Sequence, residues 1–139
     1  MGQSGCIDES HRGRTILLVE DEPLLRFYTA ELLRDMGYVV LEAANGDAAL
    51  ALVFGGHALD LVITDICMPG SLDGVALAGL IKARLPKLPV VLLSSCRLPK
   101  ERHPADRFLA KPCPPRQLSS TVAEMLGTDA KPAAGSAQL

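Results

Sequence analysis

Five short apolar runs that alternate with stretches of helical periodicity constrain the fold of this chain most. The runs are TILLV (15–19), YVVLEA (38–43), DLVIT (60–64), VVLLS (90–94) and RFLAK (107–111). Each run is typical of a strand that is buried on both faces. Strands that alternate with helices form right-handed βαβ units, so the sequence predicts an α/β fold with a parallel sheet and helices on both of its faces.

The stretches between the runs carry helix signals. Between Pro23 and Gly37, apolar residues recur at helical spacing, and they are Leu24, Leu25, Tyr28, Leu32, Leu33 and Met36. Proline suits the first turn of a helix and glycine suits its end. Further helices are predicted at 46–54 and at 74–85, and Pro114 and Pro115 open a last one.

The size and charge of the chain exclude several functions. A chain of 139 residues with 48% hydrophobic residues has the size of one domain. We expect that domain at 14–127, between a mobile segment at 1–13 and a mobile tail at 128–139. The net charge of −2 and the lack of basic runs argue against nucleic acid and membrane surfaces as partners. No segment looks like a membrane span or a secretory signal, so we expect a cytoplasmic protein.

Polar side chains stand at the carboxyl ends of the predicted strands, where ligands gather in such sheets. They are Glu20 and Asp21 after the first strand, Asp65 after the third, Ser94 in the fourth and Lys111 in the fifth. Clustered carboxylates repel one another unless a cation lies among them. Their oxygens suit Mg²⁺, which favours a phosphate oxygen as a further ligand. The cluster therefore predicts a phosphoryl group on or near Asp65, which Lys111 and Ser94 help to bind.

Each of these features also has a simpler explanation. A strand-terminal aspartate such as Asp65 can cap a turn, and the acidic triplet 20–22 can be a solvated helix start. The presence of Ser94 and Lys111 at other strand ends favours the phosphoryl site over a coincidence of caps.

Four stretches in this order and spacing resemble the receiver domain of response regulators in two-component signalling. They are ILLVEDEPLLR (16–26), LVITDICMPGSLDG (61–74), PVVLLSS (89–95) and FLAKP (108–112). The resemblance implies a flavodoxin-like, doubly wound sheet of five parallel strands in the order 2-1-3-4-5. It also implies Asp65 as the phosphoacceptor for a histidine kinase or a histidine phosphotransfer protein.

The resemblance implies a role for each further site residue. Asp21 would bind Mg²⁺ directly together with Asp65, Glu20 would act largely through water, and Cys67 would contribute its backbone carbonyl.

The same resemblance makes Ser94 the switch hydroxyl, Lys111 the phosphate-pairing lysine and Phe108 the switch aromatic. Met68 and Pro69 would support the loop after the acceptor. On phosphorylation, Ser94 would move toward the phosphoryl group and Phe108 would turn inward.

The chain departs from the family pattern at two places. Residues 70–72 make three positions between Met-Pro and Asp-Gly, where the family usually has two. Only eleven residues, 95–105, connect the last two strands, and Pro99 and Pro104 lie among them. We therefore expect the fourth helix to be short or missing. The usual dimer through that face would be weakened, which leaves a monomer or a weak dimer. Partner recognition would shift toward the first helix and the loops around Asp65.

We expect a single-domain response regulator that is not an enzyme and that acts on an unknown protein target or as a phosphate shuttle or sink. An unphosphorylated docking module with the same fold is the alternative. A phosphatase of the haloacid dehalogenase type would need a second aspartate at Cys67. A dinucleotide-binding domain would need a glycine-rich turn where this chain has EDEP.

Overall fold

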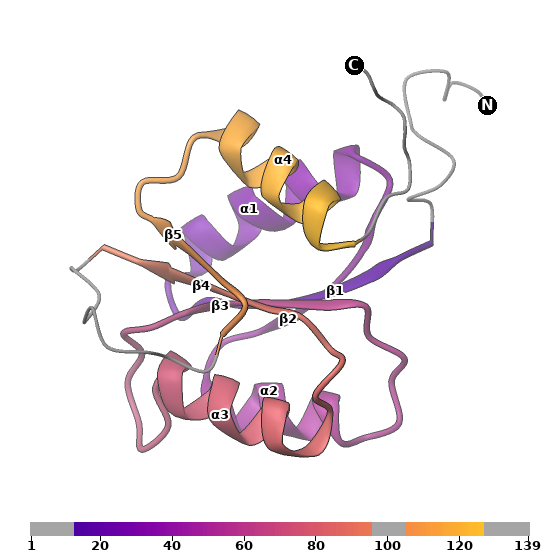
Figure 1. Cartoon of the computed structure of the whole chain (residues 1–139). Coiled ribbons are helices and arrows are strands. Elements are labelled where there is room, and N and C mark those ends of the chain that lie inside the picture. The colour runs from indigo at the N-terminus through magenta and orange to yellow at the C-terminus, as the bar shows by residue number, and fades with distance from the viewer. Residues whose placement is uncertain (1–12, 96–104, 127–139) are drawn as a thin grey trace.

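A five-stranded parallel sheet lies between two layers of helices (Figure 1). The computed structural model describes residues 13–95 and 105–126. The strands are β1 Thr15–Val19, β2 Val39–Ala43, β3 Leu61–Asp65, β4 Val90–Ser94 and β5 Arg107–Ala110. Their order is β2-β1-β3-β4-β5, and every neighbouring pair is parallel. The predicted fold class and strand order are confirmed.

Two helices cover each face of the sheet. The helices are α1 Pro23–Asp35 and α4 Pro115–Met125 on one face, and α2 Gly46–Val53 and α3 Gly74–Arg84 on the other (Figure 1). Side-chain caps start three of them, because the Glu22, Asn45 and Asp73 oxygens accept backbone N–H groups of α1, α2 and α3. These caps fix where each helix leaves the end of its preceding strand.

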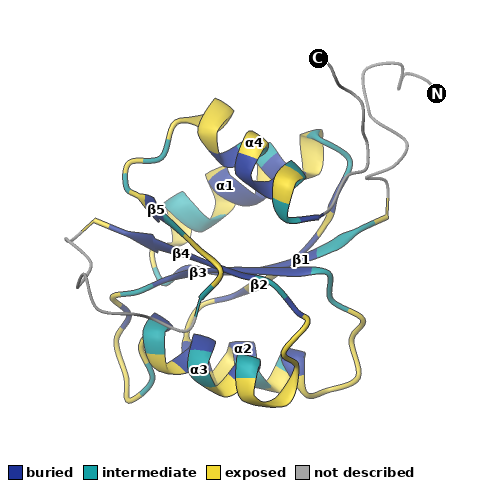
Figure 2. Ribbon diagram, in the orientation of Figure 1, coloured by how far each residue is buried: buried dark blue, intermediate teal, exposed yellow. Residues whose placement is uncertain are grey.

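The core consists of two apolar clusters, one on each face of the sheet. Every residue of β3 and β4 is buried (Figure 2), as expected for central strands covered on both sides. The third strand spans Leu61–Asp65, whereas the sequence predicted a strand at 60–64. The strand therefore includes Asp65 instead of ending just before it. Asp65 is therefore held by the sheet itself.

The predicted apolar face of α1 is only partly buried. Leu24 and Tyr28 are 78% and 54% exposed, whereas the buried residues of the helix are Thr29, Ala30 and Leu33. A helix at one side of the layer presents only one narrow stripe to the sheet. The apolar residues outside this stripe remain on the surface.

Some expectations concern segments outside the described residues. The short or missing helix within 95–105 falls on 96–104, and the mobile ends fall on 1–12 and 127–139. Within the part of the chain that the structure describes, no helix combines the length and apolar character that a membrane span requires.

Candidate functional site

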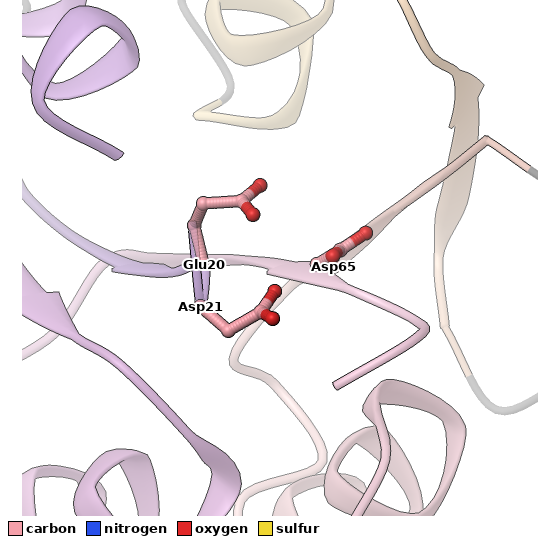
Figure 3. A group of neighbouring side chains, drawn as sticks. All are labelled: Glu20, Asp21 and Asp65. Atoms are coloured by element: carbon pink, nitrogen blue, oxygen red, sulfur yellow. The ribbon is translucent and has the colours of Figure 1, made fainter. Parts of the chain in front are cut away.

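Three carboxylates meet at the carboxyl ends of β1 and β3. Oxygen atoms of Glu20, Asp21 and Asp65 all lie within 4.8 Å of one another. Figure 3 shows the three side chains at these neighbouring strand ends. Because β1 and β3 are paired, with Val19 opposite Thr64, the residues that follow are brought together by the sheet register. The predicted acidic cluster therefore forms.

Lys111, directly after β5, joins the cluster. Its Nζ lies 3.0 Å from Oε1 of Glu20 and 3.2 Å from Oδ1 of Asp65. Side chains alternate between the two faces of a strand. This alternation directs Glu20, Asp65 and Lys111 toward the face covered by α1 and α4. The ammonium group compensates two carboxylates that are only 3% and 6% exposed.

Burial dominates the proton affinities at this site. Burial raises the pKa of Glu20 and of Asp65 above the usual carboxyl range, although the hydrogen bonds from Lys111 act in the opposite direction. Burial alone would lower the pKa of Lys111, but its hydrogen bonds and charge interactions with Glu20 and Asp65 raise it overall. The carboxylates thus lie in a poorly hydrated site that favours any additional cation.

The donor set fits a hard divalent cation. Glu20, Asp21 and Asp65 offer carboxylate oxygens from two strands, and the side of Asp21 opens on a cavity of about 370 Å³ with room for water. Mg²⁺ prefers a few carboxylates and keeps several waters.

The expected contribution of the Cys67 carbonyl to metal binding stays a prediction. Cys67 lies two residues after Asp65 and is exposed.

The two predicted switch residues lie on the same face of the sheet. Ser94 ends β4 and is 2% exposed, and Phe108 in β5 is half-buried against the α2–α3 cluster. Leu92 pairs with Phe108, and Ser94 pairs with Ala110 two residues further along. Ser94 and Phe108 therefore occupy adjacent strands, with their side chains directed toward the same layer.

The loop after Asp65 is anchored by its side chains. Met68 is buried in the α2–α3 cluster, while Pro69 is exposed and lines the cavity beside Asp21. Leu72, within the longer loop, packs against Gly46 at the start of α2. The loop is thereby held between β3 and α2.

One contact at the site was not predicted from the sequence. Nη1 of Arg26 donates a hydrogen bond of 2.7 Å to the backbone carbonyl of Glu20. The arginine belongs to the stretch ILLVEDEPLLR, but its sequence position suggests only an exposed helical residue. A backbone acceptor leaves no trace in a sequence, so this contact had no local signal.

Comparisons with known proteins agree with this geometry. The family model described as "Response regulator receiver domain" matches residues 16–123. The chain is 37% identical over 119 residues to the sensor kinase CckA of Brucella abortus and 37% identical over 113 residues to the response regulator protein FleR of Pseudomonas aeruginosa. These matches cover 81% and 78% of the chain, but only 12% and 24% of the two relatives.

Solved structures show the same fold. The response regulator protein TrrA from Thermotoga maritima, in complex with Mg²⁺-BeF, has a TM-score of 0.75 and 33% identity, with 81% of this chain and 98% of that one covered. The receiver domain of the hybrid histidine kinase CckA has a TM-score of 0.70 and 37% identity, with the same coverage. The extent of the family match, together with the acidic cluster at the strand ends, identifies this chain as a member of the response regulator receiver domain family.

Proposed function

We propose that this receiver domain accepts a phosphoryl group on Asp65 from a histidine kinase or a histidine phosphotransfer protein, in a reaction that requires Mg²⁺. The observation that carries the proposal is the convergence of Glu20, Asp21 and Asp65 within 4.8 Å, beside the ammonium group of Lys111. The complex of the relative TrrA with Mg²⁺-BeF supports the same chemistry here.

In the proposed reaction, a carboxylate oxygen of Asp65 attacks the phosphorus of a phosphohistidine in line. The new O–P bond forms as the P–N bond breaks, and the electron pair of that bond stays on the imidazole nitrogen. The end of β3 holds the carboxylate in a fixed direction, which favours in-line attack. Glu20 and Asp21 would hold Mg²⁺, which neutralises charge on the transferred oxygens when bound. Lys111 would pair with a phosphoryl oxygen.

The output would start from Ser94 and Phe108. A phosphoryl group on Asp65 offers acceptor oxygens at the end of β3, and Ser94 directly follows Leu93, the partner of Asp65 in β4. Movement of Ser94 would change the packing beside the half-buried ring of Phe108 on the adjacent strand. Such a repacking alters the surface that a protein target reads.

The exposed part of α1 would contact the phosphodonor. Leu24, Phe27 and Tyr28 are 78%, 62% and 54% exposed on the helix that begins directly after the acidic residues. A partner that brings its phosphohistidine to Asp65 has to approach this end of the sheet. Its apolar side chains can therefore cover those of α1.

Phosphorylation with a small donor tests the proposal. The protein is incubated with acetyl phosphate and Mg²⁺, and intact mass spectrometry is expected to detect one added phosphoryl group that is absent without Mg²⁺ and in Asp65→Asn. Beryllofluoride with Mg²⁺ is expected to bind the unmodified chain and not Asp65→Asn. A docking module that works unphosphorylated would show neither modification nor binding, and that result would refute the proposal.

A further inference from the structure

Arg26 connects the backbone of the acidic loop to α1. Its Nη1 donates 2.7 Å to the carbonyl oxygen of Glu20, a residue that is 3% exposed. The N–H of Glu20 still pairs with the carbonyl of Ala43 in β2, at 3.0 Å, but β1 itself ends one residue earlier at Val19. Buried carbonyls need a partner. Arg26 supplies this partner where the regular strand has ended.

Glu42 of β2 holds Arg26 in place. Nε of Arg26 lies 3.3 Å from Oε1 of Glu42, while Nη2 of Arg34 lies 3.1 Å from Oε2 of the same carboxylate. Arg34 Nη2 also donates 2.9 Å to the Val40 carbonyl. The side chain of Glu42 thus lies between two arginines of α1. The guanidinium of Arg26 is oriented by two partners, the Glu42 carboxylate and the Glu20 carbonyl. A planar guanidinium is suited to such divergent contacts.

We propose that Arg26, oriented by Glu42, is a positioning residue for the metal site. By fixing the carbonyl of Glu20, it sets the direction in which the Glu20 and Asp21 side chains leave the end of β1. This inference rests on the proposed function, since it concerns how the same carboxylates hold Mg²⁺. Arg26 itself would contact neither the metal nor the phosphoryl group.

The direction in which Arg26→Met changes the Kd for Mg²⁺ distinguishes a positioning role from a simple charge effect. Arg26 is a cation near the acidic cluster, so its field alone opposes the binding of Mg²⁺. If only the field matters, Arg26→Met tightens Mg²⁺ binding. If Arg26 positions the carboxylates, the same substitution weakens binding, because partners that orient metal ligands typically contribute about 10- to 100-fold to metal affinity.

The experiment is a titration of the full chain with Mg²⁺ alone, followed by calorimetry or by NMR shifts. Arg26→Met is expected to raise the Kd for Mg²⁺ by about tenfold or more, and an unchanged or lower Kd would overturn the inference. Arg26→Lys perturbs the fold less and is expected to raise the Kd by a smaller factor. An unchanged Kd in that variant counts against the inference equally, even if Arg26→Met does not fold.

Two further variants test the pathway and its specificity. Glu42→Gln is expected to raise the Kd in the unmodified chain but not in the Arg26→Met background, because its effect passes through Arg26. Equal effects in both backgrounds would contradict this pathway. Arg107→Met serves as the matched control, since it removes an arginine–glutamate pair (2.8 Å to Glu124) at the opposite end of the sheet. Its Kd should stay unchanged, and a rise as large as that of Arg26→Met would contradict a specific role.

The outcomes also separate this inference from the proposed function. If the unmodified chain does not bind Mg²⁺, the proposed function itself fails. If the unmodified chain binds Mg²⁺ and Arg26→Met binds it equally well, only the positioning role fails. A purely structural role would lower the melting temperature of Arg26→Met without changing the Kd of the folded protein.

Discussion

The ammonium nitrogen of Lys111 lies 3.2 Å from Oδ1 of Asp65, across the carboxyl ends of β5 and β3. The residue that we propose as phosphoacceptor is therefore paired with a cation before any phosphoryl group arrives. The two strands are separated by β4, so the long lysine side chain spans the end of that strand to reach Asp65. In the absence of metal, this contact compensates part of the carboxylate charge.

Lys111→Met is expected to destabilise the metal-free protein at neutral pH. The substitution leaves Glu20 and Asp65 buried without their cation, and breaking such a pair costs several kcal/mol unless the carboxylates take up protons. We expect a loss of roughly 2 kcal/mol in the free energy of unfolding, measured with urea. Lys87→Met, at an exposed position at the other end of the sheet, should change it by less than about 0.5 kcal/mol. Equal losses in both variants would contradict the role of the Lys111 contacts.

Mg²⁺ should stabilise the folded chain. A ligand that binds only the folded state adds about 2.7 kcal/mol at a hundredfold excess over its Kd. Melting curves with and without Mg²⁺ measure this shift. Asp21→Asn removes one carboxylate of the cluster and should abolish most of it. Coincident curves for the unmodified protein at high Mg²⁺ would show that the cluster does not bind the ion.

The stability of the metal-free protein should depend on pH through Glu20 and Asp65. Both have a raised pKa in the folded protein, chiefly through burial. The carboxyl groups of Glu20 and Asp65 therefore bind protons more tightly in the folded state than in the unfolded chain, where the carboxyl pKa is about 4. The resulting stability is fully present below the unfolded pKa and is lost as pH rises through the folded pKa.

Asp65→Asn isolates this effect. Because the amide cannot ionise, the variant should gain stability relative to the unmodified protein as pH rises from about 4 to 7. Urea unfolding in the presence of a chelator gives the difference at each pH. A difference that is constant over this range would mean that the pKa of Asp65 is not raised in the folded protein.

The sheet and most of the site were predictable because their signals are local. Runs such as VVLL (90–93) are apolar throughout. Polar residues that end or directly follow four of the five strands mark the carboxyl edge of the sheet, and they are Glu20, Asp65, Ser94 and Lys111. The strand order 2-1-3-4-5, which the resemblance to receiver domains implied, then places Asp65 and Lys111 at the same edge, with one strand between them. The strands themselves follow from periodicity, whereas their order depended on the resemblance.

Two features were not predictable in the same way. The helical spacing of Leu24 and Tyr28 indicates an apolar stripe, but the spacing does not say which stripe faces the sheet, and both residues are exposed. The bond from Arg26 to the Glu20 carbonyl depends on where β1 ends and on how α1 folds back. Such contacts arise from the packing of elements rather than from residue types.

Two glycines that begin helices provide the last prediction. Gly74 starts α3, and a Cβ added there would collide with the carbonyl oxygen of Asp65 and lie 2.7 Å from the Cα of Ile66. Gly46 starts α2, and the three atoms nearest to a Cβ there would all belong to the side chain of Leu72, the closest being Cδ2 at 2.8 Å. Backbone atoms at the end of a central strand cannot move aside, whereas Leu72, whose Cβ would also lie 2.9 Å away, belongs to the loop before α3, and a loop can shift.

Gly74→Ala should therefore destabilise the protein by about 2 kcal/mol, within the usual range for overpacking. Because the obstacle is the backbone of the acceptor itself, the rate of phosphorylation of Asp65 by acetyl phosphate should also fall. Gly46→Ala is the matched control and should change stability by less than about 1 kcal/mol, since alanine also favours the helix. Its phosphorylation rate should stay close to that of the unmodified protein. Equal effects of the two substitutions on stability and rate would mean that the start of α3 does not fix the position of Asp65.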